Sequence, residues 1–427
     1  MECLPRPALD LRRPAGFDCR LCGAPLARTV ADLGMSPPCQ NVVRPEDLGT
    51  GETFYPLHAY VCDACSLVQI DEVVPPEALF EGEYAYFSSY SDSWVAHARR
   101  YVDAVAERFG VGEHSLMVEV ASNDGYLLQH AVARGIPVLG VEPAANVAAA
   151  ARARGVPTRV AFFGEAEARA MRADGAAPRG ADLIAANNVL AHTPHLNSFV
   201  AGLAVLLAER GVVTVEFPHL VRLIDEGQFD TIYHEHFSYF SFTVAERVFA
   251  RHGLVLFDVE ELPTHGGSLR IYARHAADRS RPVGERVTAL RAREAAWGVD
   301  EPAVYDAFAA RARAVKRDLL DFLVAAARDG KTVAGYGAPG KGNTLLNYCG
   351  IGTDLVAFTV DRNPYKQGTW TPGARLPVLA PEAIAEARPD YLLILPWNLR
   401  DEIAEQQAGI RAWGGRFVVP IPALEVW

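Results

Sequence analysis

The stretch VEVASNDGYLL, residues 118–128, decides the fold of this chain. Its first residues form a short apolar run that predicts a buried strand, with Glu119 inside it. Ser122-Asn123-Asp124-Gly125 then predict a turn, and the residues after it begin a helix. At such a turn a glycine lets a ligand approach the backbone, and the helix N-terminus offers free N–H groups. The stretch therefore predicts a βα unit with a nucleoside-binding turn.

The same alternation of helical and strand patterns continues on both sides of this unit. Strands separated by helices of about ten to fifteen residues indicate a parallel sheet, so the fold class is α/β. Two later strands with a short connection predict an antiparallel pair on the sheet edge. From about residue 280 the alternation restarts and predicts a second α/β domain. The predicted strands are 116–121, 137–143, 158–163, 181–190, 211–217, 254–262 and 268–275, then 331–337, 355–361, 391–397 and 416–422.

Polar residues stand at several of the predicted strand ends. Glu142 ends the strand after the one that holds Glu119, and its carboxylate is suited to both ribose hydroxyls of a nucleoside. Asn187 and Asn188 end the fourth strand, and the carboxyl ends of the strands share one crevice. A turn with one glycine and polar neighbours suits adenosine bearing a charged amino acid better than a pyrophosphate. The alternative is an ordinary βα turn with solvated acids.

Two cysteine pairs stand near the N-terminus, Cys19-Arg-Leu-Cys22 and Cys62-Asp-Ala-Cys65. Together they supply four thiolates, the complete tetrahedral set of a structural zinc site. Gly23 follows the first pair directly and provides the tight turn of a zinc knuckle. The alternative is two redox pairs or cysteines that are unrelated to one another. We expect the other cysteines, Cys3, Cys39 and Cys349, to be packed or exposed without a chemical role.

Length and composition limit the class of protein. The chain has 427 residues, which at roughly 100–200 residues per domain corresponds to two to four domains. We expect them at 1–75, 76–278 and 279–427. A net charge of −11 argues against nucleic acid as a partner. The N-terminal residues lack an export signal, and no apolar stretch approaches the roughly 20 residues of a membrane span. We expect a cytoplasmic monomer that does not contact membranes.

The segment FDTIYHEHFSYFS, residues 229–241, is the most unusual in the chain, because two histidines, a glutamate and two tyrosines fall within seven residues. His234 and His236 could bind a metal, but H-E-x-x-H is absent and this half of the chain offers no further ligand cluster. Acid–base work is the better interpretation, because imidazole titrates near neutral pH and the adjacent Glu235 can orient it. His192, after the fourth strand, can converge on the same site.

The second α/β domain carries a lysine in a glycine-rich turn. Only four of the basic residues are lysines, and Lys341 lies in GYGAPGKGNT, between a strand and a helix. A compact ammonium beside such a turn suits a diphosphate. The spacing is not that of a P-loop. We expect Lys341 to bind a diphosphate, with a purely structural role at a domain interface as the alternative.

Several short stretches of the sequence, which follow one another in a fixed order, resemble one enzyme family. The chain is similar to the sugar 3-C-methyltransferases, which methylate thymidine diphosphate-linked 4-keto-6-deoxysugars in deoxysugar biosynthesis, and the likeness covers nearly the whole chain. YHEHFSYFS and GAPGKGNT are the specific strings. The full set is VEVASNDGYLL, ANNVLAHTPHLNSFV, EFPHLVRLIDEGQFDTIYHEHFSYFS, THGGSLRIY, GYGAPGKGNTLLNY and DRNPYKQGTWTPG, after the paired cysteine knuckles.

The resemblance implies a fold, two cofactors and a set of roles. The fold is a class I methyltransferase Rossmann-like domain between a small zinc-binding N-terminal domain and a Rossmann-like C-terminal domain. S-adenosylmethionine and a structural Zn²⁺ are the cofactors, and a dTDP-linked 4-keto-6-deoxysugar is the substrate. His236 is implied as the base that removes the C3 proton, and a tyrosine of the Tyr84/Tyr86 segment closes the site.

Further roles follow for residues within these strings. The catalytic group is His236, Tyr233, Glu235 and His192; the cofactor group is Glu119, Ser122, Asn123, Asp124, Gly125, Glu142, Asn187 and Tyr86; the substrate group is Lys341, Tyr336, Asn188 and His265. Two alternatives remain at this point. One is an NAD-dependent sugar-nucleotide oxidoreductase, and the other is a zinc-containing scaffold without turnover.

Overall fold

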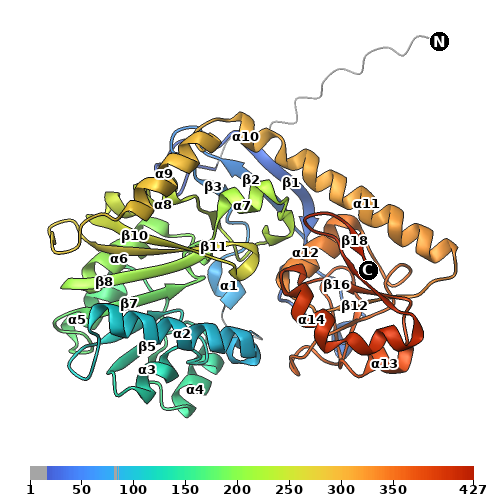
Figure 1. Cartoon of the computed structure of the whole chain (residues 1–427), viewed down its shortest axis with the longest axis horizontal. Coiled ribbons are helices and arrows are strands. Elements are labelled where there is room, and N and C mark those ends of the chain that lie inside the picture. Colours follow the sequence, from blue (N-terminus) through green and yellow to red (C-terminus); the bar gives the residue numbers. More distant parts are fainter. Residues whose placement is uncertain (1–16, 81–83, 85) are drawn as a thin grey trace, which may run out of the picture.

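The computed structural model describes residues 17–80, 84 and 86–427. Three sheets organise these residues, one of four strands and two of seven strands. The small sheet lies at the top of Figure 1, between the central seven-stranded sheet on the left and the C-terminal one on the right. Cys3 lies outside the described residues. No helix in the described part of the chain is both long enough and apolar enough to cross a bilayer.

The small sheet is built mainly by the cysteine-rich N-terminal region. Its strands are β1 (Arg28–Ser36), β2 (Tyr55–Val61), β3 (Val68–Ile70) and β9 (Ser238–Tyr239), in that order across the sheet. All three pairings are antiparallel. The last strand comes from the distant segment 229–241 that the sequence marked as catalytic. The short helix α1 (Pro76–Phe80) follows this region.

The central sheet has the order β6-β5-β4-β7-β8-β11-β10. The first five are parallel neighbours, and β11 runs antiparallel between β8 and β10. One reversed strand in a seven-stranded sheet is the arrangement of class I methyltransferases, and the predicted antiparallel edge pair is confirmed. Its strands are β4 (Met117–Val120), β5 (Val138–Val141), β6 (Thr158–Arg159), β7 (Ala181–Asn187), β8 (Leu207–Pro218), β10 (Leu254–Leu262) and β11 (Ser268–His275).

Helices cover both faces of this sheet. Successive strand residues point to opposite faces, so Met117 packs with α2 and α3, whereas Val118 packs with α5, α6 and α8. The strand order reverses at β4, and ligands bind outside the carboxyl end of such a strand. The helices are α2 (Asp92–Phe109), α3 (Leu128–Ala133), α4 (Ala145–Ala153), α5 (Glu165–Ala173), α6 (Leu196–Leu206), α7 (Leu220–Asp225) and α8 (Phe242–Arg251).

The strand predicted at 158–163 is shorter than expected. Strand β6 ends at Arg159, at the edge of the sheet. Beyond it Val160 is 42% exposed and Phe162 is 40% exposed, so this apolar run is not buried as a core strand would be.

The C-terminal sheet has the order β14-β15-β13-β12-β16-β17-β18. Its five inner strands are parallel, and the edge strands β14 and β18 are antiparallel to their neighbours. Its order reverses at β12, so the turn that holds Lys341 lies at the same kind of position as the turn after β4. The strands are β12 (Val333–Tyr336), β13 (Thr359–Val360), β14 (Thr369–Trp370), β15 (Pro377–Leu379), β16 (Tyr391–Ile394), β17 (Arg416–Val419) and β18 (Glu425–Val426). The helices in this part of the chain are α9 (Glu285–Trp297), which packs against β10 and α8 of the central domain, and α10 (Ala303–Asp306), α11 (Phe308–Arg328), α12 (Gly340–Cys349), α13 (Ala383–Ala387) and α14 (Arg400–Gln406).

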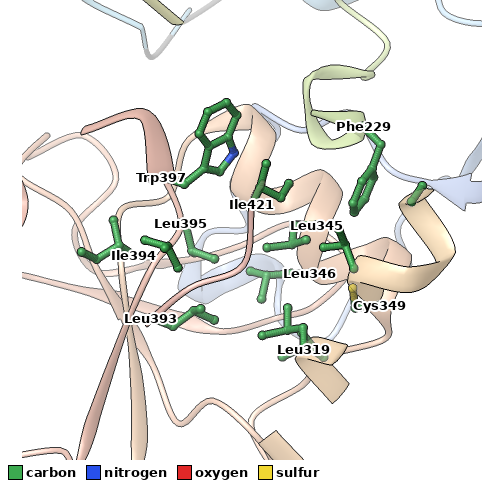
Figure 2. Close-up of a cluster of buried hydrophobic side chains, with 14 of the residues drawn as sticks. Phe229, Leu319, Leu345, Leu346, Cys349, Leu393, Ile394, Leu395, Trp397 and Ile421 are labelled. Atoms are coloured by element: carbon green, nitrogen blue, oxygen red, sulfur yellow. The ribbon is translucent and has the colours of Figure 1, made fainter. Parts of the chain in front are cut away.

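One hydrophobic core joins the C-terminal sheet to the small sheet and to the segment after β8. It contains Leu57 of β2, Phe229 and Leu345 of α12, all at most 1% exposed. Figure 2 shows Phe229 beside α12 residues Leu345 and Leu346, and its ring centroid lies 5.1 Å from that of Tyr348. This packing fixes the start of the catalytic segment.

The 3₁₀ helices are η1 (Pro45–Asp47), η2 (Ser88–Tyr90), η3 (Leu190–His192), η4 (Phe229–Thr231), η5 (Thr264–Gly266), η6 (Trp397–Leu399) and η7 (Ala408–Trp413).

Candidate active site

The four predicted zinc ligands lie together. All four sulfur atoms are within 4.8 Å of one another, with 3.5 Å between Cys19 and Cys65 and 3.6 Å between Cys22 and Cys62. Four thiolates at the usual Zn–S distance of about 2.3 Å would be about 3.8 Å apart, so the set fits a tetrahedral zinc ion. Within the described residues, this is the one group of three or more metal-binding side chains that could hold a metal ion.

The two knuckles have the same backbone shape. The amide of Gly23 donates to the Cys19 carbonyl, and the amide of Ser66 donates to the Cys62 carbonyl, both at 2.8 Å. Both residues have positive φ, 78° for Gly23 and 63° for Ser66. The glycine marked the first knuckle in the sequence, whereas a serine in this conformation gives no such signal.

The turn after β4 has an unusual backbone. Ala121, Asn123 and Gly125 have φ values of 56°, 48° and 79°. Two of them carry side chains that rarely adopt this left-handed conformation, and such strain is concentrated at functional sites. A Cβ on Gly125 would lie 3.0 Å from Val156, so close packing also requires glycine here. Asn188 and His265, at φ 52° and 55°, repeat the feature near the same crevice.

Buried acceptor oxygens surround this turn. Within the described residues, no hydrogen-bond partner reaches either carboxylate oxygen of Glu119, Oδ1 of Asp124, or the amide oxygens of Asn187 and Asn188. The hydroxyl oxygen of Ser122 also has no hydrogen-bond partner within the described residues. A buried acceptor without a donor is costly. The site therefore fits a ligand that brings several N–H and O–H donors.

The charge of the turn narrows the choice of ligand. Burial raises the pKa of Glu119, and the neighbouring carboxylates of Asp124 and Glu142 raise it further. A cation would stabilise the ionised forms of these neighbouring acids, of which Asp124 already pairs with Arg154. The ammonium and sulfonium groups, ribose hydroxyls and adenine amine of S-adenosylmethionine supply the charge and the donors, whereas the pyrophosphate of NAD supplies neither. The observed residues therefore fit S-adenosylmethionine.

Glu142 is fixed by the backbone. Its two oxygens accept from the amides of Asn123 and Ala144, at 3.0 and 2.9 Å, and burial raises its pKa to about 7. Each oxygen retains a second lone pair, so the predicted contact with ribose is still possible.

The segment before α2 lies over the cofactor turn. The amide of Ser88 donates to Oδ1 of Asn123 at 2.8 Å, and Nδ2 of Asn123 donates to the carbonyl of Tyr86 at 3.2 Å. Tyr86 is 42% exposed, and it makes this contact through its main-chain carbonyl. The hydroxyl of Tyr84 donates to Oε2 of Glu235 at 3.4 Å. The two tyrosines therefore face different parts of the site.

The catalytic segment brings His236, His192 and Tyr233 together. The His236 ring centroid lies 4.6 Å from that of His192 and 3.8 Å from that of Tyr233. Nδ1 of His236 lies 2.8 Å from the carbonyl oxygen of Thr231. A carbonyl cannot donate, so Nδ1 carries the proton and Nε2 is the basic nitrogen.

Burial sets the titration of these groups. It lowers the pKa of His236 well below its ordinary value, with a contribution from His192. It also lowers the pKa of His192 to about 4 and raises the pKa of Glu235 to about 7. At neutral pH both imidazoles are therefore uncharged, with one ring nitrogen free to accept a proton.

His234 points elsewhere. Its Nε2 lies 3.2 Å from the carbonyl oxygen of Pro56, and its ring meets Tyr55 of β2. The two histidines of the His-Glu-His string thus serve different neighbours, which does not support the metal-binding alternative.

The proposed substrate residues divide into two groups. Lys341, in the first turn of α12, donates to Oδ1 of Asn398 at 2.8 Å and lies 4.6 Å from the Trp397 ring centroid. Burial and the Lys341 charge lower the pKa of His265 to about 4, and Asn188 donates to Nε2 of His265 at 3.4 Å. Tyr336 packs instead in the C-terminal core, with its hydroxyl 3.4 Å from Oε1 of Gln406.

Sequence reasoning missed several buried polar residues of this region. Asp230 accepts from the indole of Trp397 at 2.7 Å, and Cys39 donates to Glu235 at 3.9 Å, so this thiol is not simply packed. Glu216, at the end of β8, accepts from Arg270, His97 and Thr264. A glutamate ending an apolar strand was a signal for Glu216. For Cys39, no local pattern pointed to the site.

Comparisons with known proteins match the chain in three parts. Residues 19–80 match a domain family described as zinc binding, 94–259 match a methyltransferase domain, and 263–422 match a C-methyltransferase C-terminal domain. C-methyltransferase NovU from Streptomyces niveus is 39% identical over 413 residues, which cover 97% of each chain.

Solved structures align only to part of the chain. Magnesium protoporphyrin IX methyltransferase from Synechocystis PCC 6803 has 15% identity, covers 43% of this chain and 81% of its own, and has a TM-score of 0.32. An S-adenosylmethionine-dependent methyltransferase from Mesorhizobium loti has 12% identity, 42% and 100% coverage, and a TM-score of 0.34. The fold assignment rests on the strand order and the family matches. The chain belongs to the C-methyltransferase family, as an S-adenosylmethionine-dependent enzyme with a zinc-binding N-terminal region.

Proposed function

We propose that the enzyme removes the C3 proton of a nucleoside diphosphate-linked 4-keto-6-deoxysugar, with dTDP as the nucleotide, and methylates the resulting enolate carbon. The observation that carries the proposal is the state of His236, an unprotonated imidazole whose tautomer is fixed by the Thr231 carbonyl. The choice of C3 and of the sugar nucleotide comes from the family resemblance.

His236 has the chemistry of the base. A C–H bond beside a ketone is acidic only when the enolate is stabilised, and a neutral imidazole is a suitable acceptor. Nε2 of His236 takes the proton from C3. The electron pair of the C–H bond forms the C3–C4 double bond, and the C4 carbonyl becomes an oxyanion.

Two side chains next to the base are candidates to stabilise that oxyanion. Burial raises the pKa of Tyr233, so its hydroxyl keeps its proton and can donate. His192 is neutral, with a pKa of about 4, and its ring meets that of His236 edge to face. A donor preorganised at this place is worth about 2.7–4 kcal/mol of transition-state stabilisation.

When bound, S-adenosylmethionine supplies an electrophilic methyl carbon on a sulfonium sulfur. Glu119, Asp124 and Asn187 would hold its donor groups, because both carboxylate oxygens of Glu119 and the Oδ1 atoms of Asp124 and Asn187 otherwise remain without partners in the described part of the chain. The enolate carbon would accept this methyl group, with the C–S electron pair remaining on sulfur, and the C4 ketone would re-form. His236 then releases its proton to solvent.

Lys341 supports a phosphate-bearing substrate. Its ammonium lies at the N-terminus of α12, where backbone N–H groups also favour anions. Burial lowers its pKa while the Asp230 carboxylate opposes that shift, and a diphosphate would compensate the buried charge further. His265 lies close enough to Lys341 for that charge to lower its pKa, and Asn188 donates to His265. We propose that His265 and Asn188 contact the sugar.

The proposal is tested by incubating the protein with methyl-labelled S-adenosylmethionine and a panel of 4-keto sugar nucleotides. We expect label at C3 of a dTDP-linked 4-keto-6-deoxysugar, located by NMR. Label on an oxygen or nitrogen, or on another carbon, would reject the proposed chemistry. Absence of any transfer while both ligands bind would favour the scaffold alternative.

A further inference from the structure

The loop that carries His236 is attached to the zinc knuckles. Strand β9 begins two residues after His236 and pairs with β3, which begins three residues after Cys65. In the register Gln69 faces Ser238 and Val68 faces Tyr239. The chain that binds the metal therefore continues directly into the strand that holds the catalytic loop.

Gln69 lies between the metal cluster and this strand pair. Its Nε2 donates to Sγ of Cys19 at 3.1 Å, and its Oε1 accepts from the Arg20 amide at 3.0 Å. The residue is 1% exposed. Partners of metal ligands set the orientation of those ligands, and their loss typically costs 10–100-fold in metal affinity or activity. Here the same residue also pairs with the strand after the base.

Arg20 makes the second connection. It stands inside the first knuckle, so metal coordination by Cys19 and Cys22 fixes its backbone. Its Nη2 donates to the Ile70 carbonyl at 2.6 Å, and its guanidinium carbon lies 5.4 Å from the Phe237 ring centroid. Phe237, the residue after His236, is 1% exposed.

Phe237 links this anchor to both catalytic histidines. Its carbonyl accepts from the Ile70 amide at 3.1 Å, and its amide donates to the Ala191 carbonyl at 2.7 Å. Ala191 directly precedes His192. Phe237 is therefore hydrogen-bonded both to Ile70, which follows the second zinc knuckle, and to Ala191, which precedes His192. These two bonds hold the two histidine-bearing segments together and set the 4.6 Å separation of their rings.

We propose that Arg20 and Gln69 are positioning residues through which the zinc centre sets the geometry of His236 and His192. This rests on the proposed function, in which His236 is the base. The cofactor turn is held separately, by Glu142 and by the segment at residues 86–89. Loosening the knuckle therefore impairs proton removal and leaves S-adenosylmethionine binding intact.

The test compares Arg20→Met and Gln69→Met with the control Arg28→Met. Arg28 contacts the other knuckle through Asp63 at 2.8 Å, and its side chain is 34% exposed. Within the described residues its ion-pair partners are Asp63 and Asp306, neither of which belongs to β9. All variants are saturated with zinc, and their metal content is measured. The readouts are C3 hydrogen exchange in heavy water, S-adenosylmethionine affinity by calorimetry, and the NMR signal of the His236 ring.

We expect 10- to 100-fold slower exchange in Arg20→Met and Gln69→Met, because a displacement of about 1 Å can cost 100-fold. The His236 ring signal moves, and the cofactor dissociation constant stays within twofold. A cobalt-substituted Gln69→Met enzyme shows an altered thiolate charge-transfer band, whereas Arg28→Met does not. These results would support the coupling.

Unchanged exchange and an unchanged His236 signal in both variants would overturn it. So would an equal loss in Arg28→Met, or a cofactor affinity that falls with the exchange rate. If Arg20→Met does not fold, Gln69→Met and the cobalt spectrum still decide. If the wild-type enzyme itself shows no C3 exchange, the proposed function fails, while the ring signal and the cobalt spectrum still test the coupling.

Discussion

Replacing His236 by asparagine should stop proton removal while leaving the loop in place. An asparagine amide can still donate to the Thr231 carbonyl, which now accepts from Nδ1 of the imidazole at 2.8 Å. It has no basic nitrogen at neutral pH. The substitution therefore removes the base at position 236 with little change in the local hydrogen bonding.

The expected magnitude follows from the role of a positioned base. Such a base contributes about 10²- to 10⁴-fold, or about 2.7–5.5 kcal/mol of the activation barrier. The base is available at pH 7, because the tautomer is fixed and burial lowers the pKa of His236, which keeps the imidazole uncharged.

The assay is exchange of the C3 hydrogen with deuterium, followed by NMR in the absence of methyl transfer. The unprotonated form is active, so the rate rises as pH rises through the pKa of His236 and then levels off. Because burial lowers that pKa, the rise lies below pH 6.5 and the rate is constant around pH 7.

The matched control is His234→Asn. This histidine lies in the same loop but faces the Pro56 carbonyl, so its loss should slow exchange far less. If His236→Asn exchanges hydrogen at the wild-type rate, or if the two variants are equally slow, the assignment of the base is wrong.

Three other perturbations have distinct expected results. Lys341→Ala should raise the KM of the sugar nucleotide at least tenfold and leave that of S-adenosylmethionine within twofold; equal changes in steady-state kinetics would reject the diphosphate contact. Glu119→Gln should weaken S-adenosylmethionine binding by about 1–3 kcal/mol in calorimetry, because an amide brings N–H donors among buried acceptors; an unchanged affinity would place the ligand elsewhere. Glu216→Gln should lower the free energy of unfolding at pH 7 by about 3 kcal/mol in urea titrations: burial opposes ionisation, but His97 and Arg270 lower the pKa of Glu216 from 4.5 to about 2. That contribution is complete above pH 4.5 and is lost as pH falls toward 2, so a wild-type advantage that persists at pH 2 would contradict it.

The local patterns of the sequence predicted every strand of the central sheet and β12, β13, β16 and β17 of the C-terminal sheet, but not the short strands β14, β15 and β18. Apolar runs separated by helical periodicity gave β4, β5, β7 and β8, and these are all interior strands with one registry partner on each side. The run at 158–163 was predicted too long because β6 is an edge strand, where apolar side chains remain exposed. The N-terminal strands gave no clear signal, because their side chains pack against other domains as well as their own sheet.

The site was predictable where a single turn carries the chemistry. Gly125 and the residues before it predicted a cofactor turn, and the structure shows a strained backbone there. The spacing of four cysteines predicted the zinc cluster, in which the four sulfur atoms lie within 4.8 Å of one another. Contacts between distant segments were not predictable. Cys39 reaches Glu235 across 196 residues, and no periodicity or spacing in one segment reports on such a neighbour.

The position of the catalytic loop explains why its sequence is so unusual. Glu235 receives Cys39 from the N-terminal region and Tyr84 from the segment before α2, while α12 approaches from the C-terminal sheet. At that contact a Cβ on Gly340 would lie 2.9 Å from the Cys39 sulfur, so no larger residue fits. The loop is therefore shaped by three neighbours at once. A substitution that suits only one of them leaves a buried acid or imidazole without its partner.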